Sequence, residues 1–418
     1  MTEHKVSKGS RLIAVSNRTA AGQESRAGGL AVALWDTLAD TQGLWIGWSG
    51  RILDFPSNRA KRSAEDGVEF ALTDYSRDQF DGFYLGYSNS VLWPVMHNRI
   101  DLAVFDSAYY RFYVEINEKF AEIVRHQADE ADIVWVHDYH FLLLGDILRE
   151  EGWQGKCGFF LHIPFPAPEV FRAIPEHRIV HLLHCPIGID SEGFAAAATK
   201  EPADRAATRL SRFLGERDLV IGVDRMDYSK GLPQRFEGMA DLFDRYPELH
   251  GKISFTQIAP PSRSVVEEYA QLREQLDALS GRINGDYGDL DWMPIRYLAR
   301  GYDREEIAGL FRLAKACLVT PLQDGMNLVA KEFVAAQDPQ DPGVLILSQF
   351  AGAAEQMKEA IIINPYDSSA IAEAVKQAIE MPLDERQDRW QTLFDNIAQQ
   401  DINWWRHRFM TAFEGVPA

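Results

Sequence analysis

The sequence lacks any apolar run of roughly 18 residues, the length that a membrane-spanning helix needs, and its first ten residues contain no apolar signal core. Cysteine is scarce as well. Cys157, Cys185 and Cys317 stand far apart, which argues against a disulfide framework or a zinc site. We therefore expect a soluble, unexported protein of the reducing cytoplasm with no membrane partner.

Basic residues are also fewer than acidic residues. Lys and Arg number 43 against 62 Asp and Glu, which gives a formal net charge of −19. Such a balance repels nucleic acids and anionic membrane surfaces. We expect no nucleic-acid partner, and any phosphate-binding site must be local.

Several catalytic signatures are missing. The sequence contains no Gly-x-Ser-x-Gly elbow, no His-Glu-x-x-His pair, no Walker lysine loop and no Gly-x-Gly-x-x-Gly fingerprint. Metal-dependent hydrolysis and nicotinamide chemistry lose support, so we expect neither a metal nor a cofactor.

What the 418 residues do contain is an alternation of short β-rich runs with longer helical patterns, enough for two domains. This alternation predicts an α/β fold with parallel sheets covered on both faces. The predicted strands are 12–16, 133–137, 158–162, 219–223, 252–258, 316–320 and 344–348. The predicted helices are 29–39, 108–127, 141–151, 235–246, 265–280, 304–314, 330–336 and 368–380, and 191–212 is the predicted seam between the two sheets.

Two motifs in the second half predict an anion site. Arg225 and Lys230 closely follow a predicted strand, where two permanent cations would clamp a diphosphate. The alternative is a solvated surface Arg and Lys. About a hundred residues later, Asp324 and Gly325 precede a helical start, with the carboxylate of Glu332 two turns in. This second polar half-site favours the ligand interpretation.

Polar residues also end the predicted strands of the first half. Arg18 ends the first strand, and a loop then leads to a glycine pair, Gly28 and Gly29, where a backbone can approach phosphate or simply turn. Tyr84 and Trp93 place aromatic rings beside polar groups, as sugar sites do, although most tryptophans are core residues. Polar side chains at buried strand ends are costly unless they meet a ligand or one another. The two remaining strand-end groups are the run His137-Asp138-Tyr139-His140 and the single residue His162.

Eight motifs in order resemble the trehalose-6-phosphate synthase family over nearly all of residues 11–415. They are Ser16-Asn17-Arg18, Gly28-Gly29-Leu30, Val91-Leu92-Trp93-Pro94, His137-Asp138-Tyr139-His140, Leu161-His162-Ile163-Pro164, Arg225-Met226-Asp227-Tyr228-Ser229-Lys230, Gly281-Arg282-Ile283-Asn284 and Asp324-Gly325-Met326-Asn327. The resemblance implies a retaining glucosyltransferase with two Rossmann-like domains facing across a cleft, a glycosyltransferase of the B type. It implies an acceptor-binding domain at 1–188, a nucleotide-sugar domain at 189–395, and a C-terminal helix at 396–418 that crosses back.

The same resemblance implies a role for each motif residue. Arg225 and Lys230 would hold the diphosphate of UDP-glucose, with Asp138 and His162 as further catalytic residues. The expected donor-binding residues are Gly29, Asp324, Asn327, Leu328, Val329 and Glu332, and the expected acceptor-binding residues are Arg18, Tyr84, Trp93 and Arg282, with Arg18 and Arg282 on the phosphate of glucose-6-phosphate. The implied reaction is front-face substitution without an enzyme nucleophile.

Two departures from the family stand out. Gln323 is neutral where relatives often carry Arg. Between Arg178 and Pro186 relatives carry on the order of two further strand–helix units of roughly 25–30 residues each, so the N-terminal domain is shortened. Neighbouring strands would have unpaired edges, which favours association between copies of the chain. A glucosylglycerol-phosphate synthase, or a catalytically silent homologue that binds sugar phosphate, remains as an alternative.

Overall fold

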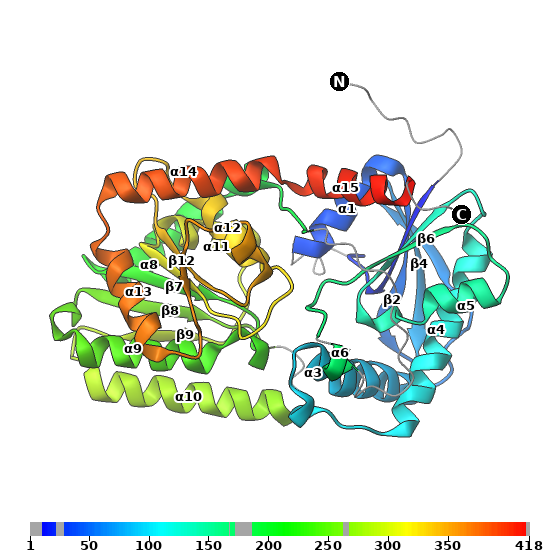
Figure 1. Cartoon of the computed structure of the whole chain (residues 1–418), viewed down its shortest axis with the longest axis horizontal. Coiled ribbons are helices and arrows are strands. Elements are labelled where there is room, and N and C mark those ends of the chain that lie inside the picture. Colours follow the sequence, from blue (N-terminus) through cyan, green and yellow to red (C-terminus); the bar gives the residue numbers. More distant parts are fainter. Residues whose placement is uncertain (1–10, 22–28, 167, 172–185, 262–266, 415–418) are drawn as a thin grey trace. The chain divides into compact units, whose positions relative to one another are not determined.

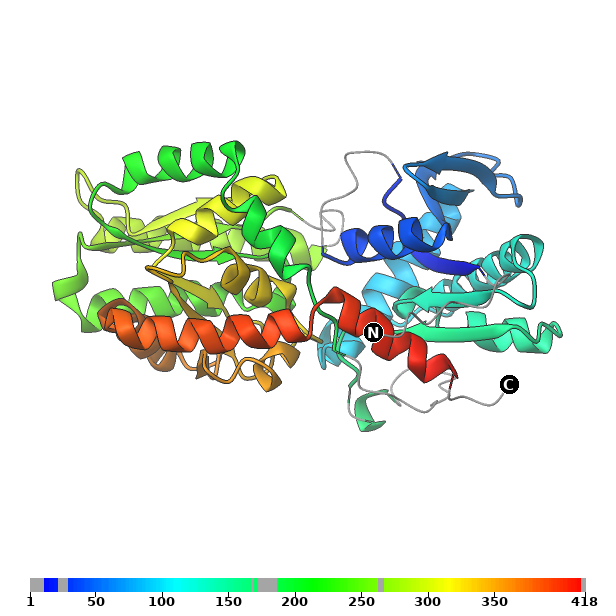
Figure 2. The same ribbon diagram turned by 90° about the horizontal axis from the view of Figure 1, so that it is seen from above.

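The computed structural model describes residues 11–21, 29–166, 168–171, 186–261 and 267–414. It divides the chain into two α/β units. Unit 1 comprises residues 1–185 and 406–418, and unit 2 comprises residues 186–405. The described part of each unit holds a six-stranded sheet between layers of helices (Figures 1 and 2).

The sheet of unit 1 has the strand order β3-β4-β2-β1-β5-β6. Strand β3 runs antiparallel to β4, and the other pairings are parallel. The strands are β1 (Leu12–Arg18), β2 (Leu44–Ile52), β3 (Lys61–Glu65), β4 (Val68–Tyr75), β5 (Ile133–His137) and β6 (Lys156–Phe160). The helices are α1 (Gly29–Thr41), α2 (Arg77–Gln79), the π-helix η2 (Phe80–Leu92), α3 (Trp93–Met96), η3 (Ile100–Leu102), α4 (Ser107–Gln127), η4 (Tyr139–Phe141), α5 (Leu144–Glu150) and α6 (Pro168–Phe171).

The sheet of unit 2 is parallel throughout, in the order β12-β11-β10-β7-β8-β9. Its strands are β7 (Asp218–Val223), β8 (Ile253–Ile258), β9 (Ile295–Leu298), β10 (Ala316–Val319), β11 (Val344–Ser348) and β12 (Ile361–Ile363). The helices are α7 (Ser191–Ala197), α8 (Glu201–Leu214), η5 (Tyr228–Lys230), α9 (Leu232–Arg245), η6 (Pro247–Leu249), α10 (Glu267–Tyr287), α11 (Arg304–Leu313), α12 (Leu328–Ala336), η7 (Gly352–Glu355), α13 (Ser368–Glu380) and α14 (Leu383–Gln399), with α15 (Ile402–Glu414) beginning in unit 2 and ending in unit 1.

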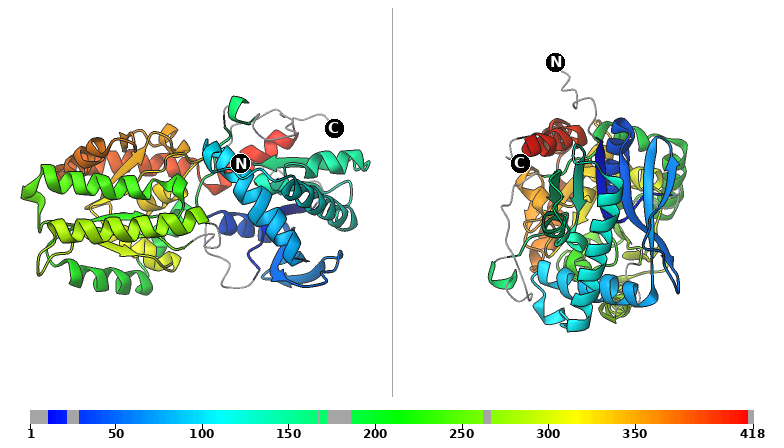
Figure 3. Two further views of the ribbon diagram at one scale, coloured as in Figure 1. Left: turned by 90° about the horizontal axis from the view of Figure 1, so that it is seen from below. Right: turned by 90° about the vertical axis from the view of Figure 1, so that its right-hand side faces the viewer.

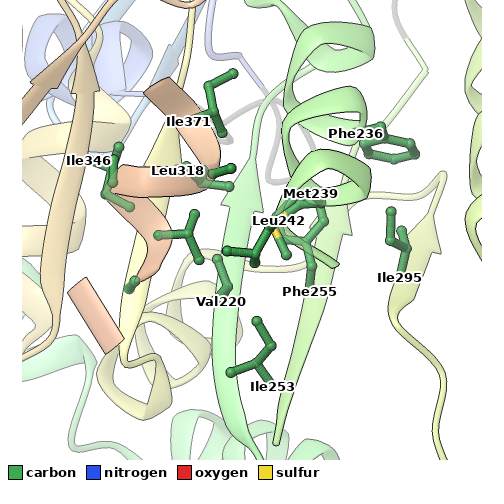
Figure 4. Close-up of a cluster of buried hydrophobic side chains, with 14 of the residues drawn as sticks. Val220, Phe236, Met239, Leu242, Ile253, Phe255, Ile295, Leu318, Ile346 and Ile371 are labelled. Atoms are coloured by element: carbon green, nitrogen blue, oxygen red, sulfur yellow. The ribbon is translucent and has the colours of Figure 1, made fainter. Parts of the chain in front are cut away.

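The core of unit 2 explains why its strands read as continuous apolar runs. Every residue of β8, β10 and β11 is buried, as expected for parallel strands covered on both faces. Figure 4 shows this core, in which Phe236, Met239 and Leu242 of α9 and Ile371 of α13 cluster with side chains of five strands, namely Val220, Ile253, Phe255, Ile295, Leu318 and Ile346.

Helix packing over this sheet depends on a glycine. Helices α9 and α10 run side by side in Figure 3, and α9 also packs on α13. A Cβ at Gly238 of α9 would lie 2.4 Å from Cγ2 of Ile371 in α13. A larger residue at 238 would therefore push the two helices apart.

Several predicted element bounds are corrected. The strand predicted at 158–162 is β6, which ends at Phe160, because its partner β5 ends opposite it at His137 and Asp138 then leaves the strand conformation with φ +72°. The helix predicted at 265–280 continues to Tyr287. The seam at 191–212 is two helices, α7 and α8, with Pro202 in the first turn of the second. Strands β2, β3, β4, β9 and β12 were not predicted at all.

The predicted missing stretch between Arg178 and Pro186 lies outside the described residues. Within the described residues, β6 pairs only with β5 and is an edge strand. Its Phe159 side chain is 40% exposed, unusual for a strand that would be covered on both sides inside a parallel sheet.

The last helix contributes to unit 1. The contact boundary between the units falls between Trp405 and Arg406, later than the predicted position of 396. Within unit 1, the ring of Phe409 stacks on Trp135 of β5 with centroids 4.7 Å apart, and Nη1 of Arg406 lies 2.9 Å from Oδ2 of Asp40 in α1. The C-terminal residues thus belong to the packing of the N-terminal sheet.

Candidate functional site

The loop after β7 carries the two cations that the sequence singled out. Arg225 is exposed two residues past the strand, and the Lys230 side chain is 15% exposed at the end of η5. Buried Asp227 braces the loop between them. Its Oδ1 accepts hydrogen bonds from N and Oγ of Ser229 at 3.0 and 2.9 Å, and its Oδ2 accepts from the hydroxyl of Tyr269 at 3.0 Å.

Gly231 lets this loop meet the neighbouring strand end. Its φ is +62°, and a Cβ would lie 2.2 Å from the carbonyl oxygen of Thr320, directly after β10. Only glycine satisfies both conditions. The loops after β7 and β10 are therefore brought together at the carboxyl edge of the sheet, where ligands bind in open parallel α/β sheets.

An ion pair links the two loops. Nζ of Lys230 donates a hydrogen bond to Oδ2 of Asp324, and Nδ2 of Asn327 donates to the same oxygen at 3.0 Å. Burial lowers the pKa of Lys230, but the carboxylates of Asp324 and Asp224 outweigh burial, so the net shift is upward. The lysine is a permanent cation that the fold holds in place.

The start of α12 supplies backbone donors. Asn327, at φ +77°, caps the helix by accepting a hydrogen bond from the backbone N–H of Ala330 at 3.2 Å. Leu328 and Val329 form the first turn, where helical N–H groups have no partner within the helix and favour anions. One turn on, burial raises the pKa of Glu332 to about 7 against the opposing charge of Arg304.

A buried polar network connects the strand ends at the carboxyl edge of the unit 2 sheet. The guanidinium of Arg235 donates to Oδ2 of Asp224 at 2.8 Å, to Oε1 of Gln257 at 2.8 Å and to Oγ1 of Thr320 at 3.0 Å. These three partners follow or belong to β7, β8 and β10. Because one planar group fixes three strand ends, the loops above them have a rigid base.

In unit 1, Arg18 lies at the end of β1 above an aromatic stack. Its Cζ is 4.9 Å from the ring centroid of Trp48 in β2, a cation–π geometry. Trp48 stacks on Tyr75 at 5.0 Å, and Tyr84 lies 6.2 Å from Trp48. Sequence reasoning missed Trp48 because it missed β2. The signal for this strand was the pair Trp45 and Trp48, which lie three residues apart in a short apolar run after the first helix.

Tyr84 is presented by the π-helix η2, a rare conformation that is often found at functional sites. A Cβ on Gly82 or Gly86 would lie 2.1 Å from Phe112 or 2.6 Å from Tyr109, so this helix approaches α4 more closely than side chains would allow. The ring of Tyr84 stacks on His140 at 5.9 Å.

Trp93 sits differently. It is only 4% exposed and packs against His97 and Tyr139 with centroids 4.3 and 5.6 Å apart. Through Tyr139, which directly follows Asp138, Trp93 lies close to the end of β5.

The strand ends of β5 and β6 meet at Asp138 and His162. Asp138 has φ +72°, a strained conformation for a non-glycine residue, and its Oδ1 accepts from the backbone N–H of Tyr139 at 3.1 Å and of His162 at 3.4 Å. Nδ1 of His137 lies 2.9 Å from Nε2 of His162. His137 at the end of β5 and His162 after β6 therefore lie in direct contact with each other.

Two further residues that the family resemblance assigned to the site, Gly29 and Arg282, both lie on helices. Gly29 is the first residue of α1, and Gly28 before it lies outside the described residues. Arg282 is exposed on α10, two residues before Asn284. Nδ2 of Asn284 donates a hydrogen bond to O of Ile295 at 2.8 Å, and Oδ1 of Asn284 accepts one from N of Ile295 at 2.9 Å. Ile295 begins β9, so within unit 2 Arg282 lies beside the amino edge of the sheet, the edge opposite to the loops that carry Lys230 and Asp324.

A different arginine follows the carboxyl edge in sequence. Arg263 comes five positions after the end of β8, the strand beside β7, but it falls within 262–266, outside the described residues. Among the residues with described placement, no group of three His, Cys, Asp or Glu is arranged to hold a metal, and no helix could cross a membrane.

Comparison with known proteins identifies relatives over the whole length. Glycosyltransferase family 20 matches residues 3–184 and 176–415. A trehalose-6-phosphate synthase of Sodalis glossinidius (strain morsitans) is 38% identical, with 98% of this chain and 97% of the relative covered. That alignment runs over 457 positions, more than the 418 residues here, so the relative has residues without a counterpart in this chain.

Solved structures agree in fold. An α,α-trehalose-phosphate synthase (UDP-forming) from Burkholderia xenovorans, in complex with glucose-6-phosphate, has a TM-score of 0.92 at 38% identity and covers 97% of this chain and 100% of its own. An E. coli structure bound with UDP-2-fluoro glucose has a TM-score of 0.91 at 38% identity, covering 98% and 100%. The two-unit Rossmann-like fold of the glycosyltransferase B type is confirmed by this likeness.

Proposed function

Because this chain belongs to glycosyltransferase family 20, we propose that it transfers glucose from UDP-glucose to glucose-6-phosphate, giving α,α-trehalose-6-phosphate and UDP. The names and bound ligands of its relatives support both substrates. The observation that carries the proposal is the Lys230–Asp324 pair, which joins two strand-end loops into one polar site.

The donor half-site lies on unit 2. Arg225 and Lys230 bind the diphosphate through charge-assisted hydrogen bonds. Asp324 accepts from glucosyl hydroxyls, and Glu332 accepts from the ribose. The backbone of Asn327, Leu328 and Val329 adds donors at the start of α12. Two residues of unit 1 complete the proposal: the family resemblance assigns Gly29 to the donor phosphate and His162 to the donor glucose.

The acceptor half-site lies on unit 1. Arg18, held over Trp48, binds the phosphate of glucose-6-phosphate. Tyr84, Trp93 and Asp138 contact the sugar, and the ring of Trp93 packs on Tyr139 beside Asp138. Arg282 takes no part, because it lies near the amino end of β9.

The proposed reaction proceeds with retention at the anomeric carbon. The bond from that carbon to the diphosphate oxygen breaks, and a bond to the acceptor hydroxyl oxygen forms on the same face. The hydroxyl proton passes to the departing phosphate oxygen. Arg225 and Lys230 stabilise the charge that develops there, so this route needs neither an enzyme nucleophile nor a metal.

Product mass distinguishes the candidate acceptors. Purified protein is incubated with UDP-glucose and either glucose-6-phosphate or glycerol-3-phosphate, and the sugar phosphate formed is identified by mass spectrometry. We expect the trehalose-6-phosphate mass as the dominant product. A dominant glucosylglycerol phosphate would instead establish the second acceptor, since Arg18 can bind either phosphate.

Donor affinity should rise with pH around neutrality. The folded-state pKa of Glu332, about 7, exceeds its ordinary value of 4.5, so the free protein holds this carboxyl protonated below neutrality. Glu332 therefore adds to the free energy of unfolding below about pH 4.5, and this contribution is lost as the pH rises through about 7. Ribose hydroxyls need the carboxylate as acceptor, so UDP-glucose affinity gains roughly tenfold from about pH 6 to about pH 8.

Calorimetric titration of UDP-glucose at several pH values measures this effect. In Glu332→Gln the affinity should be weaker and nearly independent of pH. Glu305→Gln, at a half-buried glutamate in α11, is the matched control and should keep the wild-type profile. A wild-type affinity that stays flat across this range would contradict the role of Glu332.

We also infer that the protein acts in the cytoplasm on small-molecule substrates, which its acidic composition and scarce cysteine support. Among the described strands β6 lies at the edge of its sheet, and this position supports association between copies of the chain. Light scattering during size-exclusion chromatography measures this directly, and a monomer at micromolar concentration would contradict it.

A further inference from the structure

His137 is a fully buried histidine that the proposed reaction does not use. It is the last residue of β5, with 0% exposure, and its ring lies 4.4 Å from Trp135. Its Nδ1 lies 2.9 Å from Nε2 of His162. Burial lowers the pKa of His162 to about 3 and that of His137 well below its ordinary value, so both rings are neutral near pH 7.

Two neutral rings in contact allow only two arrangements, because each carries one N–H. In the first, Nδ1–H of His137 donates to Nε2 of His162, which leaves Nε2 of His137 without a proton. In the second, Nε2–H of His162 donates, which leaves a proton on Nε2 of His137. The surroundings of that last nitrogen decide between the two.

Nε2 of His137 is buried with no hydrogen-bond partner among the described residues. A buried N–H without an acceptor is rare in proteins, and leaving one unsatisfied carries a desolvation cost. The second arrangement would create such an orphaned donor, whereas the first leaves only a bare lone pair. The first arrangement is therefore favoured.

We propose that His137 is a positioning residue: its Nδ1–H donates to Nε2 of His162, which fixes the proton of His162 on Nδ1 and makes that nitrogen a hydrogen-bond donor to a substrate oxygen. This rests on the proposed function, in which His162 faces the donor glucose. Asp138 complements it by accepting from the backbone N–H of His162. A sugar hydroxyl that accepts from His162 keeps its own proton for a carboxylate.

The proton position is measurable without turnover. Long-range nitrogen–proton correlation spectra of isotope-labelled histidine report which ring nitrogen is protonated, and loss of one signal set in His162→Gln assigns His162. We expect wild-type His162 to carry its proton on Nδ1. A proton on Nε2 in the wild-type protein overturns the proposal.

Substitutions of His137 separate the hydrogen bond from the packing. His137→Asn keeps an amide donor near the Nδ1 position, His137→Phe keeps a ring without a donor, and His137→Asp offers an acceptor only. We expect the Asn variant to retain the wild-type signal of His162, and the Asp variant to move the proton to Nε2. His126→Asn, at an exposed position in the last turn of α4, is the matched control.

Kinetics provide an independent readout. His137→Phe and His137→Asp should lower kcat/KM for UDP-glucose roughly tenfold, the effect of one hydrogen bond, while His137→Asn recovers most of it and UDP affinity is unchanged in all three. A His162 signal that does not change in the Phe and Asp variants overturns the proposal. Wild-type protein that holds the Nδ1 proton but transfers no glucose would instead refute only the proposed function.

Discussion

Replacing Lys230 by alanine is expected to lower kcat/KM for UDP-glucose by about 10²- to 10³-fold, the effect typical of removing one preorganised donor from developing charge. The variant loses a cation at the departing diphosphate. It also leaves Asp324, now without its lysine, as an unbalanced negative charge beside the ligand. Steady-state kinetics and UDP titration measure both effects.

Two companion variants identify the cause. Lys230→Ala combined with Asp324→Asn removes the repulsion and should recover part of the UDP affinity but little of the rate. Lys200→Ala, which breaks an exposed pair with Glu305, is the matched lysine control and should change the rate less than about twofold. A Lys230→Ala variant within threefold of wild type would show that the clamp lies elsewhere.

Replacing Arg18 by alanine is expected to raise KM for glucose-6-phosphate about 10- to 100-fold, because a charge-assisted hydrogen bond to phosphate is lost. UDP affinity should be unaffected, since the donor half-site lies on unit 2. Initial rates at varied glucose-6-phosphate, together with UDP titration, separate the two substrates.

Arg282→Ala is the informative contrast. The family resemblance assigned Arg282 to the acceptor phosphate, but the structure sets it beside the amino end of β9. We expect this variant to change KM for glucose-6-phosphate less than about twofold, as for most exposed substitutions. A rise in KM as large as that of Arg18→Ala would contradict this prediction and would show that Arg282 binds the acceptor phosphate.

Continuous apolar runs made much of unit 2 predictable. The predicted strand 344–348 coincides with β11, and 316–320 exceeds β10 by one residue. Shorter or mixed segments were not predictable in this way. β12 is three isoleucines, and β2 interrupts its apolar pattern with Gly47, Ser49 and Gly50. The π-helix η2 contains two glycines that argue against any helix, and only its packing on α4 accounts for them.

The candidate site shows the same division. Lys230 and Asp324 were predicted from separate motifs, and the structure pairs them. Trp48 could not be assigned without β2, because its role depends on lying beside the end of β1. The position of Arg282 could not be predicted, because motif order does not reveal that a helix as long as α10 carries its last turns away from the carboxyl edge of its sheet.

The central claim is that this shortened chain transfers glucose between the two half-sites. UDP release from UDP-glucose by the purified protein, measured with and without glucose-6-phosphate, tests it most directly. The account predicts release that depends on glucose-6-phosphate and yields one trehalose-6-phosphate per UDP. Tight UDP binding without acceptor-dependent release would contradict it and would favour a catalytically silent sugar-phosphate-binding homologue.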